Sequence, residues 1–254
     1  MTPNEFNTIK QMITAYWATL NLKQIKAEFA SKGLLTQNKK LSKGDNDNWG
    51  LELLPSVLGP INTCPGAGKC RYTCLAFSGI GNVIKGPKMI AGLEMSAMLM
   101  SKARKLFLYV NDNEFFNAIL KNEIENRALV SGLMGKSIAV RLNTTSDLDW
   151  TELTNSLPNV QFYDYTKVWT RKSTANYNLT FSVAEHNTQE QIEEKLNNNE
   201  SVAIVFHKLP ETYMGFPVVD GDVDDDRYND VKGTIIGLKY KTTVGGKDDT
   251  SFVR

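Results

Sequence analysis

The sequence predicts an α/β protein built as an incomplete or irregular (β/α) barrel with N-terminal helices. Three observations support this. Short apolar strands recur after residue 136, and the first four start roughly twenty residues apart. The segments between them are polar or amphipathic, and the clearest of these covers residues 188–197. The strands are almost continuously apolar, which is typical of a parallel sheet covered on both faces. About seven strands are predicted, fewer than the eight of a regular barrel, so an open doubly wound sheet is the second possibility.

Two regions are expected along the chain. Residues 1–48 form a helical segment followed by a polar linker, and residues 49–254 form the barrel-like domain. In the first region an apolar stripe through Phe6, Ile9, Ile13 and Trp17 predicts a helix within residues 4–31. The chain has 254 residues, of which 41% are hydrophobic. A chain of this size buries a sufficient core without disulfides or metals.

The second region starts with a predicted strand at residues 49–58 and continues with helical patterns at 87–110 and 113–133. Six further strands are predicted after this point, at residues 137–142, 159–163, 177–182, 201–206, 216–219 and 234–238.

The three cysteines of the chain lie in one segment, where Cys64, Cys70 and Cys74 have the spacing C-x5-C-x3-C. Thiolates are soft metal ligands, and glycines and a proline in the segment allow its backbone to fold around one centre. The neighbouring Lys69 and Arg71 are expected to lower the pKa values of the thiols. Three thiolates are one short of a closed four-cysteine site. The set therefore leaves one coordination position open or is completed by another residue.

Three interpretations remain open for these cysteines. They bind a [4Fe-4S] cluster with one open iron, or they bind zinc together with one histidine, or they pack a turn as reduced thiols. His186 and His207 are the only histidines, and His207 follows a predicted strand. It is the expected fourth metal ligand if a protein side chain completes the set.

Polar side chains follow several of the predicted strands. Because the carboxyl ends of parallel strands meet at one edge, we expect these side chains to gather around a single ligand or cofactor site. The acidic run at residues 220–227 is either part of that site, a magnesium site or a solvated turn. The expected binding residues are Asp147, Lys167, Glu185, Asp220 and Asp222, and Arg141 and Tyr165 belong to the same strand-end group.

The charge is unevenly distributed. Residues 1–110 carry 14 basic and 6 acidic side chains, a net charge of +8, whereas residues 111–254 carry 15 basic and 22 acidic ones. A basic first part allows an alternative function, a zinc-stabilised module that binds nucleic acid. No apolar run is long enough to span a membrane. The N-terminus lacks the features of a secretory signal, so a cytoplasmic protein is expected.

Several motifs together resemble one known family. In chain order they are N-T-C-P-G-A-G-K-C, S-D-L-x-W, P-N-V-Q-F-Y-D-Y-T-K and P-V-V-D-G-D. This series is similar to the phage-borne gene product eighty-eight family over roughly residues 45–254. The resemblance implies a bacteriophage origin, the host cytoplasm as its setting, and the three cysteines as the ligand set. Asp147, Lys167, Asp220 and Asp222 occupy motif positions of unknown role.

A more distant similarity connects the chain to radical S-adenosylmethionine enzymes, which combine a partial barrel with a three-cysteine cluster after the first strand. Their usual spacing is C-x3-C-x2-C, from which this chain departs. The similarity implies S-adenosylmethionine as a candidate ligand of an open iron, and an enzymatic or redox role. The predicted function is therefore that of a phage iron–sulfur protein that binds a small molecule, and its reaction is left open.

Overall fold

The fold was analysed in a computed structural model, which describes residues 2–38, 41–43, 46–74, 76, 89–90, 93–241 and 250–254. Its helices are α1 (Pro3–Trp17), α2 (Leu22–Lys32), α3 (Ala97–Asn111), α4 (Asn113–Leu133), α5 (Thr151–Asn155) and α6 (Gln189–Asn197). The strands of the main sheet are β1 (Leu35–Thr36), β2 (Asp47–Leu51), β5 (Ile138–Arg141), β6 (Gln161–Thr166), β7 (Tyr177–Ser182), β8 (Val202–Phe206), β9 (Thr212–Tyr213), β10 (Phe216–Asp220) and β11 (Ile235–Lys239). All seven strands predicted from the sequence are present, with shifted ends.

The main sheet has nine strands in the order β1-β2-β5-β6-β7-β8-β11-β10-β9. The strands from β2 to β10 in this order pair in parallel, and the two-residue strands β1 and β9 add antiparallel edges. β1 and β9 lie at opposite ends of the order, so the sheet is open. The α/β class is confirmed, but closure into a barrel is not, because closure requires the two edges to pair.

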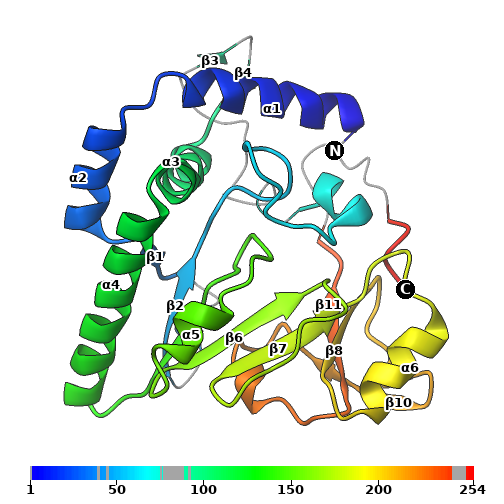
Figure 1. The fold of residues 1–254 in the computed structure, drawn as a ribbon. Coiled ribbons are helices and arrows are strands. Elements are labelled where there is room, and N and C mark those ends of the chain that lie inside the picture. Colours follow the sequence, from blue (N-terminus) through cyan, green and yellow to red (C-terminus); the bar gives the residue numbers. More distant parts are fainter. Residues whose placement is uncertain are drawn as a thin grey trace.

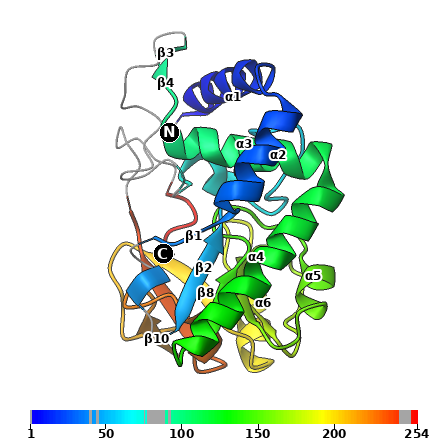
Figure 2. The ribbon, with the colours of Figure 1, turned by 90° about the vertical axis from the view of Figure 1, so that its left-hand side faces the viewer.

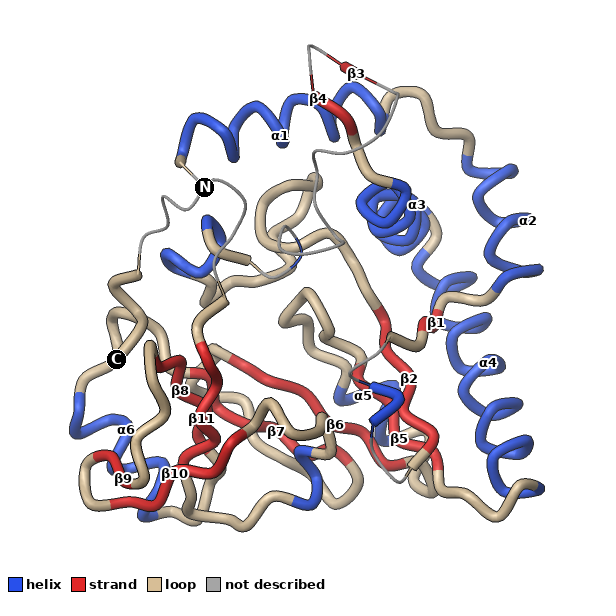
Figure 3. The backbone as a smooth tube through the Cα atoms, turned by 180° about the vertical axis from the view of Figure 1, so that it is seen from behind, coloured by secondary structure: helices blue, strands red, loops and turns tan. Residues whose placement is uncertain are grey.

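Helices cover one face of this sheet, which we call the outer face; the opposite face is called the inner face (Figures 1 and 3). On one half, Phe116, Leu120 and Ile124 of α4 pack against Val140 of β5 and Phe162 of β6. On the other half, α6 packs against β7, β8 and β11. The side chains on this face alternate along each strand with those on the inner face, as the period of a strand requires.

The inner face, opposite these helices, is covered by other elements. Within the described residues, it is covered by the short helical turns η1 (Leu41–Lys43) and η5 (Arg227–Asn229). Leu41 and Tyr228 pack there against Ala139 and Tyr163. The acidic run before η5 is therefore largely buried against the sheet, since Asp225 is only 1% exposed.

The N-terminal helices lie beside α3, above the strands (Figure 2). Phe6, Ile9 and Ile13 of α1 form a second core with residues of α3, and Thr2 and Glu5 form a capping box at the start of α1. β1, from the predicted linker, extends the main sheet.

The helix predicted at 87–110 begins only at α3, where Ser96 caps its N-terminus. The preceding residues include the small strands β3 (Met89–Ile90) and β4 (Leu93–Glu94). Residues 87, 88, 91 and 92 of that prediction lie outside the described part.

Candidate functional site

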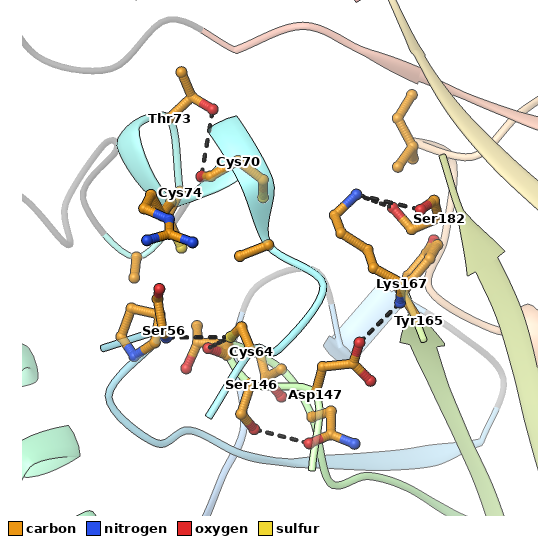
Figure 4. A pocket seen from close by; sticks show the side chains of 18 of the residues that line it. Ser56, Cys64, Cys70, Thr73, Cys74, Ser146, Asp147, Tyr165, Lys167 and Ser182 are labelled. Carbon is orange, nitrogen blue, oxygen red and sulfur yellow. Dashed lines mark hydrogen bonds between the residues drawn. The ribbon is translucent and has the colours of Figure 1, made fainter. Parts of the chain in front are cut away.

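A cavity of about 450 Å³ lies at the carboxyl ends of the parallel strands. Cys64, Cys70 and Cys74 line it on one side, and Tyr165 and Lys167 lie on the other (Figure 4). This is the edge at which open parallel sheets usually bind ligands.

The three cysteines belong to a segment, residues 63–74, that we call the cysteine turn. It connects to the segment that follows β2 through the hydroxyl of Thr63, which donates to the Leu54 carbonyl at 2.6 Å. Successive backbone hydrogen bonds wind the turn, from Ala67 N to Cys64 O at 3.1 Å and from Cys70 N to Ala67 O at 2.8 Å. All three thiols are therefore presented by one compact piece of backbone.

Two glycines allow the cysteine turn to lie directly on the strand ends. A Cβ atom on Gly66 would lie 2.7 Å from the Cβ of Lys167, and one on Gly68 would overlap Oε1 of Glu185. Gly68 also has a φ of +49°, in the left-handed region that favours glycine. Oε1 of Glu185 accepts a hydrogen bond from the backbone N–H of Lys69 at 2.8 Å. Glu185 thus holds the turn against the sheet and is not part of the cavity lining.

Burial dominates the electrostatics of two of the thiols. It raises the pKa of Cys64 to about 11, although the backbone N–H of Ser56 donates to its sulfur at 3.2 Å. Burial likewise raises the pKa of Cys74 to about 12, with an added contribution from Cys70 and an opposing one from the Lys102 ammonium. This is opposite to the lowered values expected from the sequence. Lys69 and Arg71 do not compensate for the loss of solvent around these sulfurs.

The described side chains contain no group of three histidines, cysteines or carboxylates close enough to share one metal ion. The three thiols face the same cavity without converging on a common point.

Asp147 connects the cysteine turn to two strand ends. Its backbone N–H donates to the Thr63 carbonyl at 2.7 Å, next to Cys64. Its carboxylate accepts from the backbone N–H of Lys167 at 2.8 Å and from Nη1 of Arg171 at 2.6 Å. Because both carboxylate oxygens are occupied, Asp147 positions the turn from the wall of the cavity.

The ammonium of Lys167 donates to three neutral oxygens at the end of β7. These are the carbonyl and hydroxyl of Ser182, at 3.3 and 2.9 Å, and the carbonyl of Val183, at 3.1 Å. No carboxylate of the described residues forms an ion pair with this ammonium, so its positive charge remains available to a ligand in the cavity.

One charged pair of the site was not anticipated from the sequence. Lys102 of α3 and Glu52 form an ion pair at 3.2 Å, with side chains only 5% and 14% exposed, and both line the cavity. Lys102 lies in an amphipathic helix, and no sequence signal indicates that this helix covers the strand ends.

The remaining predicted residues are distributed differently. Asp222 lines the cavity and pairs with Lys241 at 2.8 Å. Asp220 is not among the described lining residues, and it pairs at 2.8 Å with Lys239, which lines the cavity. His207 is exposed, with its ring against Tyr240, and is also absent from the described lining. Of the predicted strand-end residues, Glu185, Asp220 and His207 are not among the described residues that line the cavity, because following a strand does not determine where a side chain points.

The acidic run is neither a solvated turn nor, within the described residues, a cluster of metal ligands. Asp225 forms an ion pair with Arg141 at 3.0 Å, and Asp226 accepts a hydrogen bond from the Asn48 amide at 2.6 Å. These contacts attach the run to the inner face of β2 and β5.

None of the described helices is long and apolar enough to cross a membrane.

Comparison with known proteins gave one match. The sequence model of a family described as gene product 88 matches residues 26–254. The match begins inside α2, whereas the motifs in the sequence predicted a similarity that begins only near residue 45. No curated protein and no solved structure matches the chain.

Proposed function

We propose that this chain, which belongs to the gene product 88 family, is a bacteriophage protein that binds a [4Fe-4S] cluster through Cys64, Cys70 and Cys74. One iron would remain open toward the cavity to bind a small molecule. The observation that carries the proposal is that three thiols of one turn line a single cavity at the carboxyl ends of parallel strands.

The separation of the thiols supports a cluster over a single zinc ion. A zinc site requires its four ligands to converge tetrahedrally on one ion. In a four-iron cluster each thiolate binds a different iron, so the sulfurs need not meet at a point. The only histidines, His186 and His207, are both exposed and absent from the described lining of the cavity. A site of three cysteines and one histidine therefore has less support.

The charges around the cavity suit thiolate ligands once positive iron is present. Buried thiols with raised pKa values stay protonated at neutral pH unless a cation compensates their charge. Lys102 and Arg71 line the same side of the cavity and add positive charge near the sulfurs. A bound cluster supplies one-electron redox chemistry and an iron that a chelating amine and carboxylate can bind. S-adenosylmethionine carries both groups and is the first ligand to test.

The first experiment is anaerobic reconstitution followed by iron and sulfide analysis. Wild-type protein should contain about four iron and four sulfide per chain and be brown. Cys64→Ser, Cys70→Ser and Cys74→Ser should each lose this content, because a hydroxyl is a poor ligand for the cluster. Colourless protein with one zinc per chain would contradict the proposal, as would full cluster content in all three variants.

The second experiment tests the open iron by electron paramagnetic resonance of the reduced cluster. Added S-adenosylmethionine should change the spectrum, and Lys167→Met should weaken the change while the iron is retained. Lys136→Met is the matched control, because this lysine is exposed and lies outside the described lining of the cavity, so the change should stay intact. A spectrum that does not change on addition of S-adenosylmethionine or other small chelators would refute the open site.

A further inference from the structure

Four side chains on the inner face of the sheet, below the cysteine turn, carry buried donor groups without hydrogen-bond partners in the described part of the chain. These groups are Nε of Arg141, the hydroxyls of Tyr165 and Thr180, and Nε and Nη1 of Arg227.

These groups come from neighbouring elements. Tyr165 of β6 and Thr180 of β7 are register partners, so their side chains leave the sheet on the same face. The guanidinium carbon of Arg141 lies 4.8 Å from the centre of the Tyr165 ring. Arg227 lies in η5, which packs against β6 and β7. Arg141 and Tyr165 line the cavity, and Thr180 and Arg227 are not among its described lining residues.

Each unpaired group has a cost, because water has been removed without a replacement partner. Native proteins rarely leave such groups unpaired, and a cluster of them calls for a specific explanation. Both arginines already have carboxylate partners, Asp225 for Arg141 and Asp224 for Arg227. The Nε–H group of each arginine has no hydrogen-bond acceptor, and neither has Nη1 of Arg227, although it lies 3.3 Å from a carboxylate oxygen of Asp230. The arrangement therefore offers donors to a group that enters from the cavity.

The charge of the cavity indicates what that group is. Six basic side chains line the cavity against three acidic ones, Glu52, Asp147 and Asp222. Each of these acids is paired with a cation, at 3.2, 2.6 and 2.8 Å respectively. Arg141 and Lys239 are in turn paired with Asp225 and Asp220, so within the described residues the excess positive charge is that of Arg71 and Lys167. An oxyanion satisfies several N–H and O–H donors at once and is stabilised by this charge.

We propose that Arg141 and Tyr165, assisted by the neighbouring Thr180 and Arg227, bind the oxyanion group of a small molecule that carries a carboxylate or a phosphate. No donor of this site belongs to the cysteine turn. The inference therefore goes beyond the cluster proposal and holds or fails separately from it.

The test is isothermal titration calorimetry, which measures the affinity of the full-length protein for inorganic phosphate and for succinate, at constant ionic strength set with chloride. Tyr165→Phe removes only the unpaired hydroxyl, and Thr180→Val removes another with little change of shape. Tyr163→Phe is the matched control, since this neighbour on the same face donates to Asp225 at 3.3 Å and does not line the cavity.

At least one of the two anions should bind saturably, and the one that binds identifies the phosphate or the carboxylate source. Tyr165→Phe should weaken this binding about tenfold, the effect of losing one hydrogen bond to a charged group, and Thr180→Val should weaken it less. Tyr163→Phe should bind like the wild type. Absence of saturable binding to both anions would overturn the inference, and so would wild-type affinity in Tyr165→Phe, which is the result expected if only water occupies the site.

Discussion

Substitution of Gly66 by alanine tests whether the cysteine turn depends on direct contact with the strand ends. The added Cβ would lie 2.7 Å from the Cβ of Lys167 and 2.9 Å from its backbone oxygen, whereas ordinary contacts begin at 3.4 Å. The turn and the end of β6 must therefore separate by about 0.7 Å (3.4 − 2.7). The backbone of Gly66 is not in the left-handed region, so the effect is steric.

The expected cost is about 1–3 kcal/mol in the free energy of unfolding, the usual range for overpacking a closely packed site. A flexible side chain could move aside more cheaply, but here the near atoms include backbone. The displacement should also move Cys64 and Cys70 relative to the cavity. We therefore expect Gly66→Ala to hold less iron after reconstitution, although all three cysteines remain.

Urea unfolding of the metal-free protein measures the first effect, and iron and sulfide analysis measures the second. Gly132→Ala in α4 is the matched control. A Cβ there meets nothing within 4 Å, and alanine in a helix should stabilise by about 0.5–1 kcal/mol. If Gly66→Ala unfolds at the wild-type urea concentration and keeps its full iron content, the proposed packing of the turn on β6 is refuted.

Three further predictions concern titratable groups and ion pairs. Burial raises the pKa of Asp164 to about 7. The folded protein therefore keeps a proton that the unfolded chain loses near pH 4, so stability should fall as the pH rises toward 7. Asp164→Asn should flatten this dependence in urea titrations, and an unchanged slope would contradict it. Arg171→Met leaves the Asp147 carboxylate buried without its ion-pair partner and should lower the free energy of unfolding by about 3–5 kcal/mol. Lys239→Met breaks an exposed ion pair and should lower it by less than about 1 kcal/mol. Equal losses in urea unfolding would refute this comparison. The rate of Cys64 alkylation in folded, metal-free protein, measured by mass spectrometry, should still increase above pH 9, because the pKa of this thiol is about 11. A rate that levels off near pH 9 would indicate an ordinary thiol.

The positions of the strands and the α/β class follow from local sequence patterns. The strands predicted at 177–182 and 201–206 correspond to β7 and β8 within one residue. Residues 202–206 are continuously apolar, as expected of a strand buried in a parallel sheet, whereas residues 177–182 alternate between apolar and polar side chains. The cysteine turn is also visible in the sequence, since its three thiols and two critical glycines lie within eleven residues. The site residues Asp147 and Lys167 were predicted from their place after strands.

Other features depend on contacts between residues that are distant in sequence. Whether the sheet closes depends on pairing of its edges, and whether a strand-end side chain faces the cavity depends on its neighbours. His207 and Lys167 both follow strands, yet only Lys167 lies in the described lining of the cavity. Likewise, nothing local shows that the acidic run packs inside the sheet against Arg141, or that Lys102 of α3 reaches Glu52. Composition and periodicity determine which segments form strands and which residues can bind a metal. Only the tertiary structure decides which side chains meet, because burial and ion pairing depend on distances in space that no local pattern contains.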